Sequence, residues 1–209
     1  TNRDGIRMLK GKRGTKVMVK VHRRNAAGLI PLTITRDVIP TYSVDIAYMV
    51  DSATGYIKLS KFSATTYDEF IKAMSTLSSA GMKRLVLDLR GNYGGYLQAG
   101  INISDEFLED GQLIVYTEGH SRPNKYAYAT KRGTFEVSPL VILIDEGSAS
   151  ASEIVAGAVQ DNDRGTIVGR RSFGKGLVQE QLSFPDGSAL RLTVARYHTP
   201  TGRHIQRPY

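Results

Sequence analysis

The sequence contains no cysteine among its 209 residues. This absence excludes a thiol nucleophile, thiolate metal ligands and disulfides, but it leaves the compartment open, because exported proteins also exist without disulfides. No apolar run approaches 18 residues, so no segment is expected to span a membrane. A charged and then apolar leader is also lacking at the start, but Thr1 is not an initiator residue, which is compatible with a leader that has been removed.

Acidic residues are scarce at one end of the chain only. The sequence has 28 Lys/Arg and 20 Asp/Glu, and residues 1–40 hold ten of the basic and two of the acidic residues, so the remainder holds 18 of each. A basic segment at one end could contact phosphate or anionic lipid, but a solvated face explains it more simply. We therefore expect no nucleic-acid partner.

Residues 1–40 predict a small α/β fragment. Residues 4–10 have a helical pattern, Val17, Val19 and Val21 alternate with polar residues as in a half-buried strand, and residues 32–35 suggest a second strand. One short helix and two strands bury too little to stand alone. Residues 1–40 are therefore expected to be the end of one domain, and residues 41–209 a second domain.

The pattern from residue 41 onward alternates strands with helices. Strands are predicted at residues 42–50, 55–59, 85–89, 113–117 and 140–144. Thr66-Tyr67-Asp68-Glu69 has the form of a capping box before one helix, and a second helix is expected from Leu97. The alternation predicts the α/β class, with a sheet flanked by helices.

Gly147-Ser148-Ala149-Ser150-Ala151-Ser152-Glu153 lies between the apolar run of residues 140–144 and another helical pattern. It predicts a tight turn from a buried strand into a helix N-terminus. The first amides of a helix have no intrahelical acceptor, so an alkoxide or oxyanion at this turn would meet free donors. The simpler alternative is that the serines only cap the helix.

Two glycine-rich loops are candidates for phosphate sites. Residues 91–95 lack the order of a dinucleotide fingerprint. Residues 169–175 fit Gly-x-x-x-x-Gly-Lys, but position 176 is Gly, which has no hydroxyl for magnesium. A predicted hairpin at residues 177–195, where a P-loop needs a helix, also argues against a nucleotide site, and no Asp/Glu/His grouping has metal spacing.

Lys175, in a Phe-Gly-Lys-Gly turn, is a candidate general base for a serine. It must be neutral to accept a proton, and lowering a lysine pKa from about 10.4 to about 7 costs on the order of 4.6 kcal/mol. Only burial away from carboxylates supplies this.

These motifs resemble those of the C-terminal processing peptidases, also called tail-specific proteases. The similarity runs from about Asp4 to the C-terminus and includes the Ser-Ala-Ser-Ala-Ser run, Phe-Gly-Lys-Gly, Asp-Gly-Ser-Ala-Leu and residues 197–203. The resemblance implies Ser150 as nucleophile, Lys175 as base and Gln179 as a neutral partner of the lysine. It also implies the amides of Gly95 and Ala151 as oxyanion donors.

The resemblance further implies a Clp-protease/crotonase-like core at residues 41–209, preceded by the C-terminal part of a PDZ domain at residues 1–40. It implies a serine endopeptidase that acts on protein or peptide substrates through their C-termini, with no cofactor and no metal. The bacterial cell envelope, as a periplasmic or extracytoplasmic location, is the implied compartment. Association with the membrane periphery and homo-oligomer formation remain open expectations.

Several alternatives accompany this interpretation. Ser148 and Ser152 are rival nucleophiles, although Ser148 is better placed to cap the helix and Ser152 lies further into it. A Ser-His-Asp triad is not indicated, because no motif selects any of the histidines. Asp88 and Asp161 are interpreted as structural hydrogen-bonding residues, and Arg90 and Asn92 as residues that shape the glycine loop. A non-catalytic peptide-binding or assembly module with the same fold is the alternative function. The histidines are His22, His120, His198 and His204.

Overall fold

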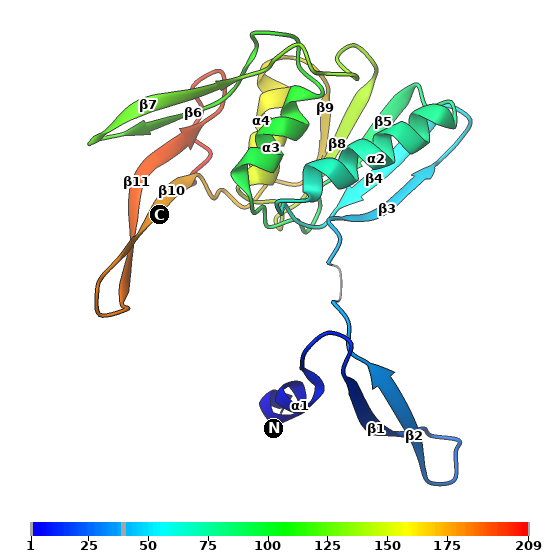
Figure 1. Cartoon of the computed structure of the whole chain (residues 1–209). Helices are drawn as coiled ribbons and strands as arrows, with labels where there is room; N and C mark the ends of the chain where they lie inside the picture. Colours follow the sequence, from blue (N-terminus) through cyan, green and yellow to red (C-terminus); the bar gives the residue numbers. More distant parts are fainter. Residues whose placement is uncertain (1, 39–40, 209) are drawn as a thin grey trace. The chain divides into compact units, whose positions relative to one another are not determined.

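The computed structural model describes residues 2–38 and 41–208, and the chain forms two compact units, Thr1–Thr41 and Tyr42–Tyr209 (Figure 1). The expected domain boundary after residue 40 adjoins residues 39–40, which lie outside the described residues. None of the described helices combines the length and the apolar character needed to cross a bilayer.

The N-terminal unit consists of α1 (Asn2–Leu9) and an antiparallel pair of strands, β1 (Lys16–His22) and β2 (Leu29–Thr35). The helix and both strands predicted from the sequence are present. Arg36 donates hydrogen bonds to the carbonyls of Leu9 (2.7 Å) and Met8 (3.0 Å), so its guanidinium satisfies the C-terminal end of α1. No residue of α1 is buried and Met18 of β1 is 84% exposed, so this unit leaves many of its apolar side chains uncovered.

A five-stranded sheet forms the centre of the second unit, in the order β3-β4-β5-β8-β9. The first pair is antiparallel and the others are parallel. Ile57, Leu87 and Ile142 form one row across three neighbouring parallel strands, and each is fully buried. The strands are β3 (Val44–Met49), β4 (Thr54–Leu59), β5 (Arg84–Asp88), β8 (Leu140–Ile144) and β9 (Thr166–Gly169).

Three helices follow parallel strands of this sheet: α2 (Thr66–Ser79), α3 (Leu97–Asp105) and α4 (Ala151–Asp161). The parallel strands are added in one direction, so right-handed crossovers place these helices on the same face. This arrangement confirms a mixed α/β fold.

The predicted capping box at Thr66 is wrong. Helix α2 has Thr65 at its N-cap, and the Glu69 carboxylate instead accepts the amides of Ser43 (2.6 Å) and Val44 (3.1 Å). Thr65 holds this carboxylate with a hydroxyl hydrogen bond of 2.8 Å. Glu69 therefore fastens the start of β3 to α2, a long-range contact that competes with local capping.

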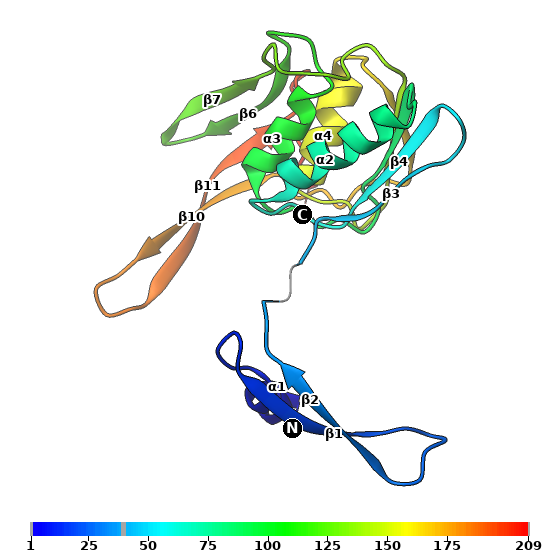
Figure 2. The same cartoon turned by 45° about the vertical axis from the view of Figure 1, so that its right-hand side comes forward.

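A second, antiparallel sheet has the order β10-β11-β6-β7. Its strands are β6 (Leu113–Gly119), β7 (Arg122–Tyr128), β10 (Leu177–Ser183) and β11 (Ala189–His198). The predicted hairpin is present as β10 and β11, whereas β7 was not predicted. Figure 2 shows α3 and α4 between the two sheets.

Helix α4 contributes to two hydrophobic cores. Val155 and Val159 belong to the core against the five-stranded sheet, and Ile154 and Ala158 belong to the core against the second sheet. A helix that is apolar on all sides is stable only where it is covered on all sides. All residues from Ala151 to Val159 are indeed buried, which fixes the position of the helix N-terminus.

Candidate active site

The turn from β8 into α4 holds its N-cap residue, Ser150, in an uncommon conformation. The φ angle of Ser150 is 55° and its ψ angle is −112°. Among the described non-glycine residues, only Ser150 and Asp163 have a positive φ. A residue in such a region typically costs about 1–3 kcal/mol and persists only where the surroundings enforce it.

The three serines of this turn have different environments. The buried Ser148 hydroxyl donates to the Leu89 carbonyl (2.8 Å) and accepts from the Asp145 amide (3.0 Å). The buried Ser152 hydroxyl donates to the Asn92 carbonyl (2.9 Å). Ser148 therefore does not cap the helix, contrary to the expectation. Ser150 is only partly buried, and its hydroxyl donates no hydrogen bond to any residue that the structure describes.

Glu153 links the serine turn to the turn that carries Lys175. Its carboxylate is buried, and Oε2 accepts the backbone amides of Ser150 and Lys175, at 2.8 Å each. Oε1 accepts the Gly174 amide (2.6 Å) and the Ser172 hydroxyl (2.7 Å). The backbone nitrogens of Ser150 and Lys175 are therefore no further apart than twice 2.8 Å.

Sequence reasoning missed this role of Glu153. The signal was available, because Ser150 and Glu153 have the Ser-x-x-Glu spacing of a capping box, in which the glutamate returns a hydrogen bond to the N-cap amide. The spacing could not reveal that the same carboxylate also accepts hydrogen bonds from the turn that carries Lys175. The donors from residues 172–175 reach the same carboxylate only in the folded chain.

The glycine-rich loop at residues 91–95 packs against the serine turn through Asn92. The buried Asn92 side chain donates to the Leu59 carbonyl (2.9 Å) and accepts the Gly94 amide (2.9 Å). The backbone carbonyl of Asn92 accepts the Ala149 amide (3.0 Å). An added Cβ on Gly94 would lie only 2.5 Å from the Ala149 carbonyl oxygen. Glycine at position 94 therefore permits the close approach of the two loops.

Two backbone amides near Ser150 are available as donors. Gly95 bridges Phe62, and the bridge uses the Gly94 carbonyl and the Tyr96 amide, so the Gly95 amide takes no part in it. The Ala151 amide, at the first position of α4, has no acceptor within the described part of the chain. The two loops meet here, because a Cβ on Gly94 would be 2.9 Å from the Ala151 nitrogen.

The side chains of Lys175 and Gln179 are both exposed. The Lys175 amine has no hydrogen bond or ion pair within residues 2–38 and 41–208. The structure thus brings the Lys175 backbone to the serine turn, but it does not place the amine against Gln179, which lies in β10 opposite Thr193. The described residues also do not bury the lysine.

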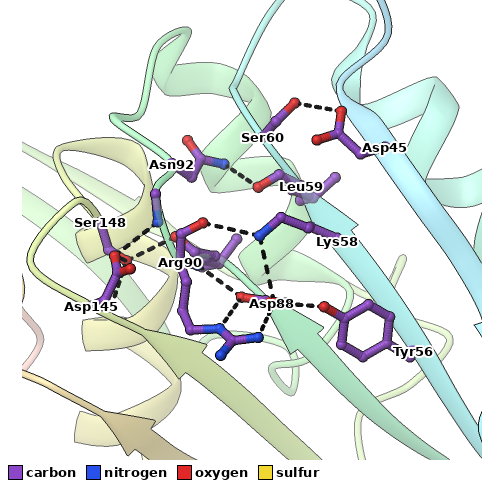
Figure 3. A network of polar contacts seen from close by, with 12 residues as sticks. Asp45, Tyr56, Lys58, Leu59, Ser60, Asp88, Arg90, Asn92, Asp145 and Ser148 are labelled. Carbon is purple, nitrogen blue, oxygen red and sulfur yellow. Dashed lines mark hydrogen bonds and ion pairs between the residues drawn. The ribbon is translucent and has the colours of Figure 1, made fainter.

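Asp88, at the end of β5, anchors the glycine loop through Arg90 (Figure 3). Arg90 donates to both carboxylate oxygens, at 2.7 and 3.0 Å, and the Tyr56 hydroxyl donates at 2.6 Å. Burial alone would raise the pKa of Asp88, but hydrogen bonds from Arg90 and Tyr56 outweigh it and hold the pKa well below 3.8. Asp88 is therefore an ionised structural residue.

Asp145 makes a second connection between the two loops, also visible in Figure 3. Its Oδ1 accepts the amides of Gly91 (2.8 Å) and Gly147 (2.9 Å), one from each loop. Asp161 is structural as well, because it pairs with Arg203 and accepts the Thr201 amide at 3.1 Å.

The histidines have other neighbours. His198 is buried, stacks on Tyr116 at 4.7 Å and lies 3.6 Å from a Glu118 oxygen, and His204 packs on His198 at 4.5 Å. His120 contacts Ser121. No hydrogen bond joins a histidine to Ser150, and no three His, Asp or Glu side chains gather as metal ligands among the described residues.

Comparisons with known proteins find one family. Residues 53–208 match peptidase family S41. A carboxyl-terminal-processing protease of Picosynechococcus sp. is 40% identical over 202 residues, which cover 95% of this chain and 48% of the relative. The carboxy-terminal processing protease CtpA of Bacillus subtilis is 35% identical, over 98% of this chain and 43% of the relative. A solved photosystem II D1 C-terminal processing protease has a TM-score of 0.73 at 34% identity, covering 94% of this chain and 54% of that one. The chain spans about half the length of these relatives.

Proposed function

Because the chain belongs to peptidase family S41, we propose that it is the core of a serine endopeptidase that hydrolyses peptide bonds near the C-termini of protein substrates. The names of its relatives support this activity, and the environment of Ser150 supports the chemistry. In this proposal Ser150 is the nucleophile and Lys175 its general base.

The main support for the Ser150–Lys175 dyad is that one Glu153 carboxylate accepts hydrogen bonds from both residues. It keeps the backbones of Ser150 and Lys175 together, while the rival hydroxyls of Ser148 and Ser152 are bound to backbone carbonyls. Lys175 takes the hydroxyl proton as Ser150 attacks a peptide carbonyl, and then gives it to the leaving amine. A water activated in the same way releases the acyl-enzyme.

The amides of Gly95 and Ala151 would stabilise the tetrahedral oxyanion. Both lack an acceptor in the described chain and lie on loops that pack together. Loss of one such donor typically costs about 3–4 kcal/mol of transition-state stabilisation. Since the donors are backbone groups, the packing of the two loops controls their positions.

Lys175 must be neutral to act as a base, and its side chain is exposed. In this proposal the substrate supplies the missing desolvation, because a peptide lying across both turns would exclude water from the amine and favour its neutral form. Gln179 would then serve as an uncharged partner of the amine.

We further propose that residues 1–40 are the C-terminal part of a PDZ-like domain and residues 41–209 a Clp-protease/crotonase-like peptidase core. The uncovered apolar side chains of the first unit support its origin in a larger domain. The relatives are named for carboxy-terminal processing, so the protein would act on protein C-termini. The motif resemblance adds the bacterial cell envelope, a periplasmic or extracytoplasmic compartment, as the proposed location.

The proposal is tested by cleavage of β-casein, an unfolded protein substrate, with products identified by mass spectrometry. The chain should cleave it, while Ser150→Ala and Lys175→Ala, assayed well below their melting temperatures, should lose at least about 10³-fold in rate. Equal turnover by all three proteins would overturn the dyad. Tight peptide binding without any cleavage would favour the non-catalytic module, the alternative that the exposed Lys175 amine supports.

A further inference from the structure

The turn that carries Lys175 is not stabilised by hydrogen bonds of its own. Residues 171–176 belong to no helix or strand, and within the described chain no hydrogen bond joins two backbone groups of this segment. The backbone hydrogen bonds of the turn are all made to other parts of the protein. The partners of these bonds therefore determine the position of Lys175.

The serine turn and the start of α4 supply only part of these contacts. Glu153 accepts the amides of Gly174 and Lys175, and Phe173 donates its amide to the Ser148 carbonyl at 3.0 Å. The Gly174 carbonyl and both backbone groups of Gly176 have other partners. These partners belong to β11 and to the chain that follows it.

Strand β11 and the chain after it bind the two glycines that flank the lysine. The Arg207 amide donates to the Gly174 carbonyl at 3.1 Å, and the Tyr197 amide donates to the Gly176 carbonyl at 2.8 Å. The Gly176 amide donates to the side-chain oxygen of Gln206 at 3.1 Å. The Gln206 Nε2 donates to the Arg207 carbonyl, also at 3.1 Å, which orients the side-chain amide. Gln206 is thus the one residue that reaches the lysine turn with a side-chain acceptor from this part of the described chain.

The contacts at the two glycines leave no room for a side chain. A Cβ on Gly176 would overlap the backbone nitrogen of Gln206 and lie 2.9 Å from the Ile205 carbonyl carbon. Gly174 has a φ of 86°, and a Cβ there would lie 2.8 Å from Arg207 Cβ. The glycines therefore permit the lysine turn to lie directly against the backbone of the chain after β11.

This chain is itself fixed to the end of α4. It reverses direction after β11, where the Thr199 amide donates to the Arg203 carbonyl at 3.0 Å. Asp161, the last residue of α4, accepts the Thr201 amide at 3.1 Å and pairs with Arg203. Helix α4 therefore fixes the lysine turn twice, near its start through Glu153 and at its end through the chain after β11.

We propose that Gln206 is a positioning residue for the general base, because its side-chain amide fixes the Gly176 end of the lysine turn and thereby the place of Lys175 relative to Ser150. The inference rests on the proposed function, in which Lys175 is the base. Gln206 does not act on the substrate. An amide oxygen suits this role, because it accepts the Gly176 hydrogen bond without a negative charge near the lysine, and such a charge would favour the protonated amine.

The test measures catalysis and the order of the lysine turn separately. Gln206→Met keeps a side chain of similar length but removes the acceptor. Its kcat for a fluorogenic peptide that spans a β-casein cleavage site should fall by at least about tenfold with little change in KM, because the base is misplaced. Hydrogen exchange in peptides that cover residues 171–177, followed by mass spectrometry, should become about two- to tenfold faster, as expected for one lost hydrogen bond. Urea unfolding identifies conditions in which both proteins are fully folded.

Gln160→Met is the matched control. Gln160 also accepts a hydrogen bond of 3.1 Å, from Arg203, but has none to the lysine turn in the described chain. This variant should leave kcat and the exchange of residues 171–177 unchanged. Gln206→Glu is the conservative variant, because it keeps an acceptor oxygen and adds a charge. It should preserve the slow exchange and lose activity at neutral pH, but it should recover kcat as the pH rises and the lysine becomes neutral.

Unchanged exchange in Gln206→Met would overturn the inference, and so would faster exchange with an unchanged kcat. Equal losses of kcat at every pH in Gln206→Met and Gln206→Glu would also overturn it. When the unsubstituted chain cleaves the peptide, these results contradict the positioning role alone. A chain that cleaves neither β-casein nor the peptide contradicts the proposed function, and the role of Gln206 fails with it.

Discussion

Ser150 and Lys175 donate their backbone amides to one atom, Glu153 Oε2, at 2.8 Å each. The two residues belong to different turns, one before α4 and one before β10. Their separation is thus set by a single buried carboxylate rather than by either turn alone. Any change to Glu153 should therefore alter the relative position of nucleophile and base.

We predict that Glu153→Gln lowers kcat by about 10²-fold or more and changes KM little, because a small misplacement of reacting groups has such effects. A glutamine has one carbonyl oxygen for four donors, so its NH₂ group would face two of them. The free energy of unfolding should fall by about 1–3 kcal/mol. Steady-state kinetics well below the melting temperature and urea unfolding measure the two effects.

Glu146→Gln is the control for this prediction, since Glu146 is an exposed residue of the same turn and pairs with Arg170 at the surface. It should leave kcat unchanged. A decrease in the activity of Glu153→Gln that only follows its unfolded fraction would contradict a positioning role.

The second prediction concerns the close contact at Gly94. In Gly94→Ala the added Cβ would lie 2.5 Å from the Ala149 carbonyl oxygen and 2.8 Å from Ser150 Cβ, so the loops must separate and cleavage should fall by at least about tenfold. Gly91→Ala is the matched control: its φ is also positive, at 72°, but no atom lies within 4 Å of the new Cβ. It should lose only about 1 kcal/mol of stability. Equal activities of the two variants would refute the contact.

The third prediction separates the three serines. Ser148→Ala and Ser152→Ala remove buried hydrogen bonds to backbone carbonyls, so each should lower the free energy of unfolding by about 1–3 kcal/mol. Their activity should decrease only as far as the folded fraction does. Ser150→Ala should abolish cleavage in a chain that stays folded, with a loss of stability no larger than that of an N-cap serine, about 0.5–2 kcal/mol. Thermal unfolding and β-casein cleavage by the three variants check this, and an inactive but stable Ser152→Ala would point to a different nucleophile.

The fourth prediction is an acid-dependent stability from Asp88. Its pKa in the folded state lies below the ordinary 3.8, so its contribution is present above pH 3.8 and is lost as the pH falls further. At pH 7, Asp88→Asn should be less stable by about 2–3 kcal/mol, because hydrogen bonds to a charged group are weakened. Below pH 3.8 the difference should shrink. Urea unfolding at pH 7 and pH 3 measures it, and a constant difference would show that the charge is not involved.

Local patterns in the sequence predicted most of the secondary structure. The strand at residues 140–144 is present with the predicted bounds, and the helix expected from Leu97 begins there. The first is a continuous apolar run and the second has apolar residues at helical spacing, and both are covered in the folded chain. Strand β7 escaped prediction because its residues, Arg122 to Tyr128, include a proline and are mostly polar. Strand β7 lies at the edge of its sheet, next to β6. An edge strand needs few buried apolar residues and tolerates proline, so its sequence has no strong strand pattern.

The candidate site was predictable as a set of motifs, but not as an arrangement. The serine turn, the glycine loop and the lysine turn each have a recognisable sequence. The contacts that bring them together, through Glu153, Asn92 and Asp145, join residues far apart in the chain and have no local signature. No sequence pattern indicates where the Lys175 side chain lies either. Its burial was expected because a general base must be neutral, and not because any residue pattern predicted it.

Helix α4 has a consequence for how this protein loses activity on heating. Its two apolar faces belong to different cores, so neither sheet can melt without uncovering the helix that begins beside Ser150. The residues from Tyr42 onward should therefore unfold in one cooperative transition, with inactivation and loss of secondary structure superimposed. An inactive but otherwise folded intermediate should not accumulate during thermal denaturation.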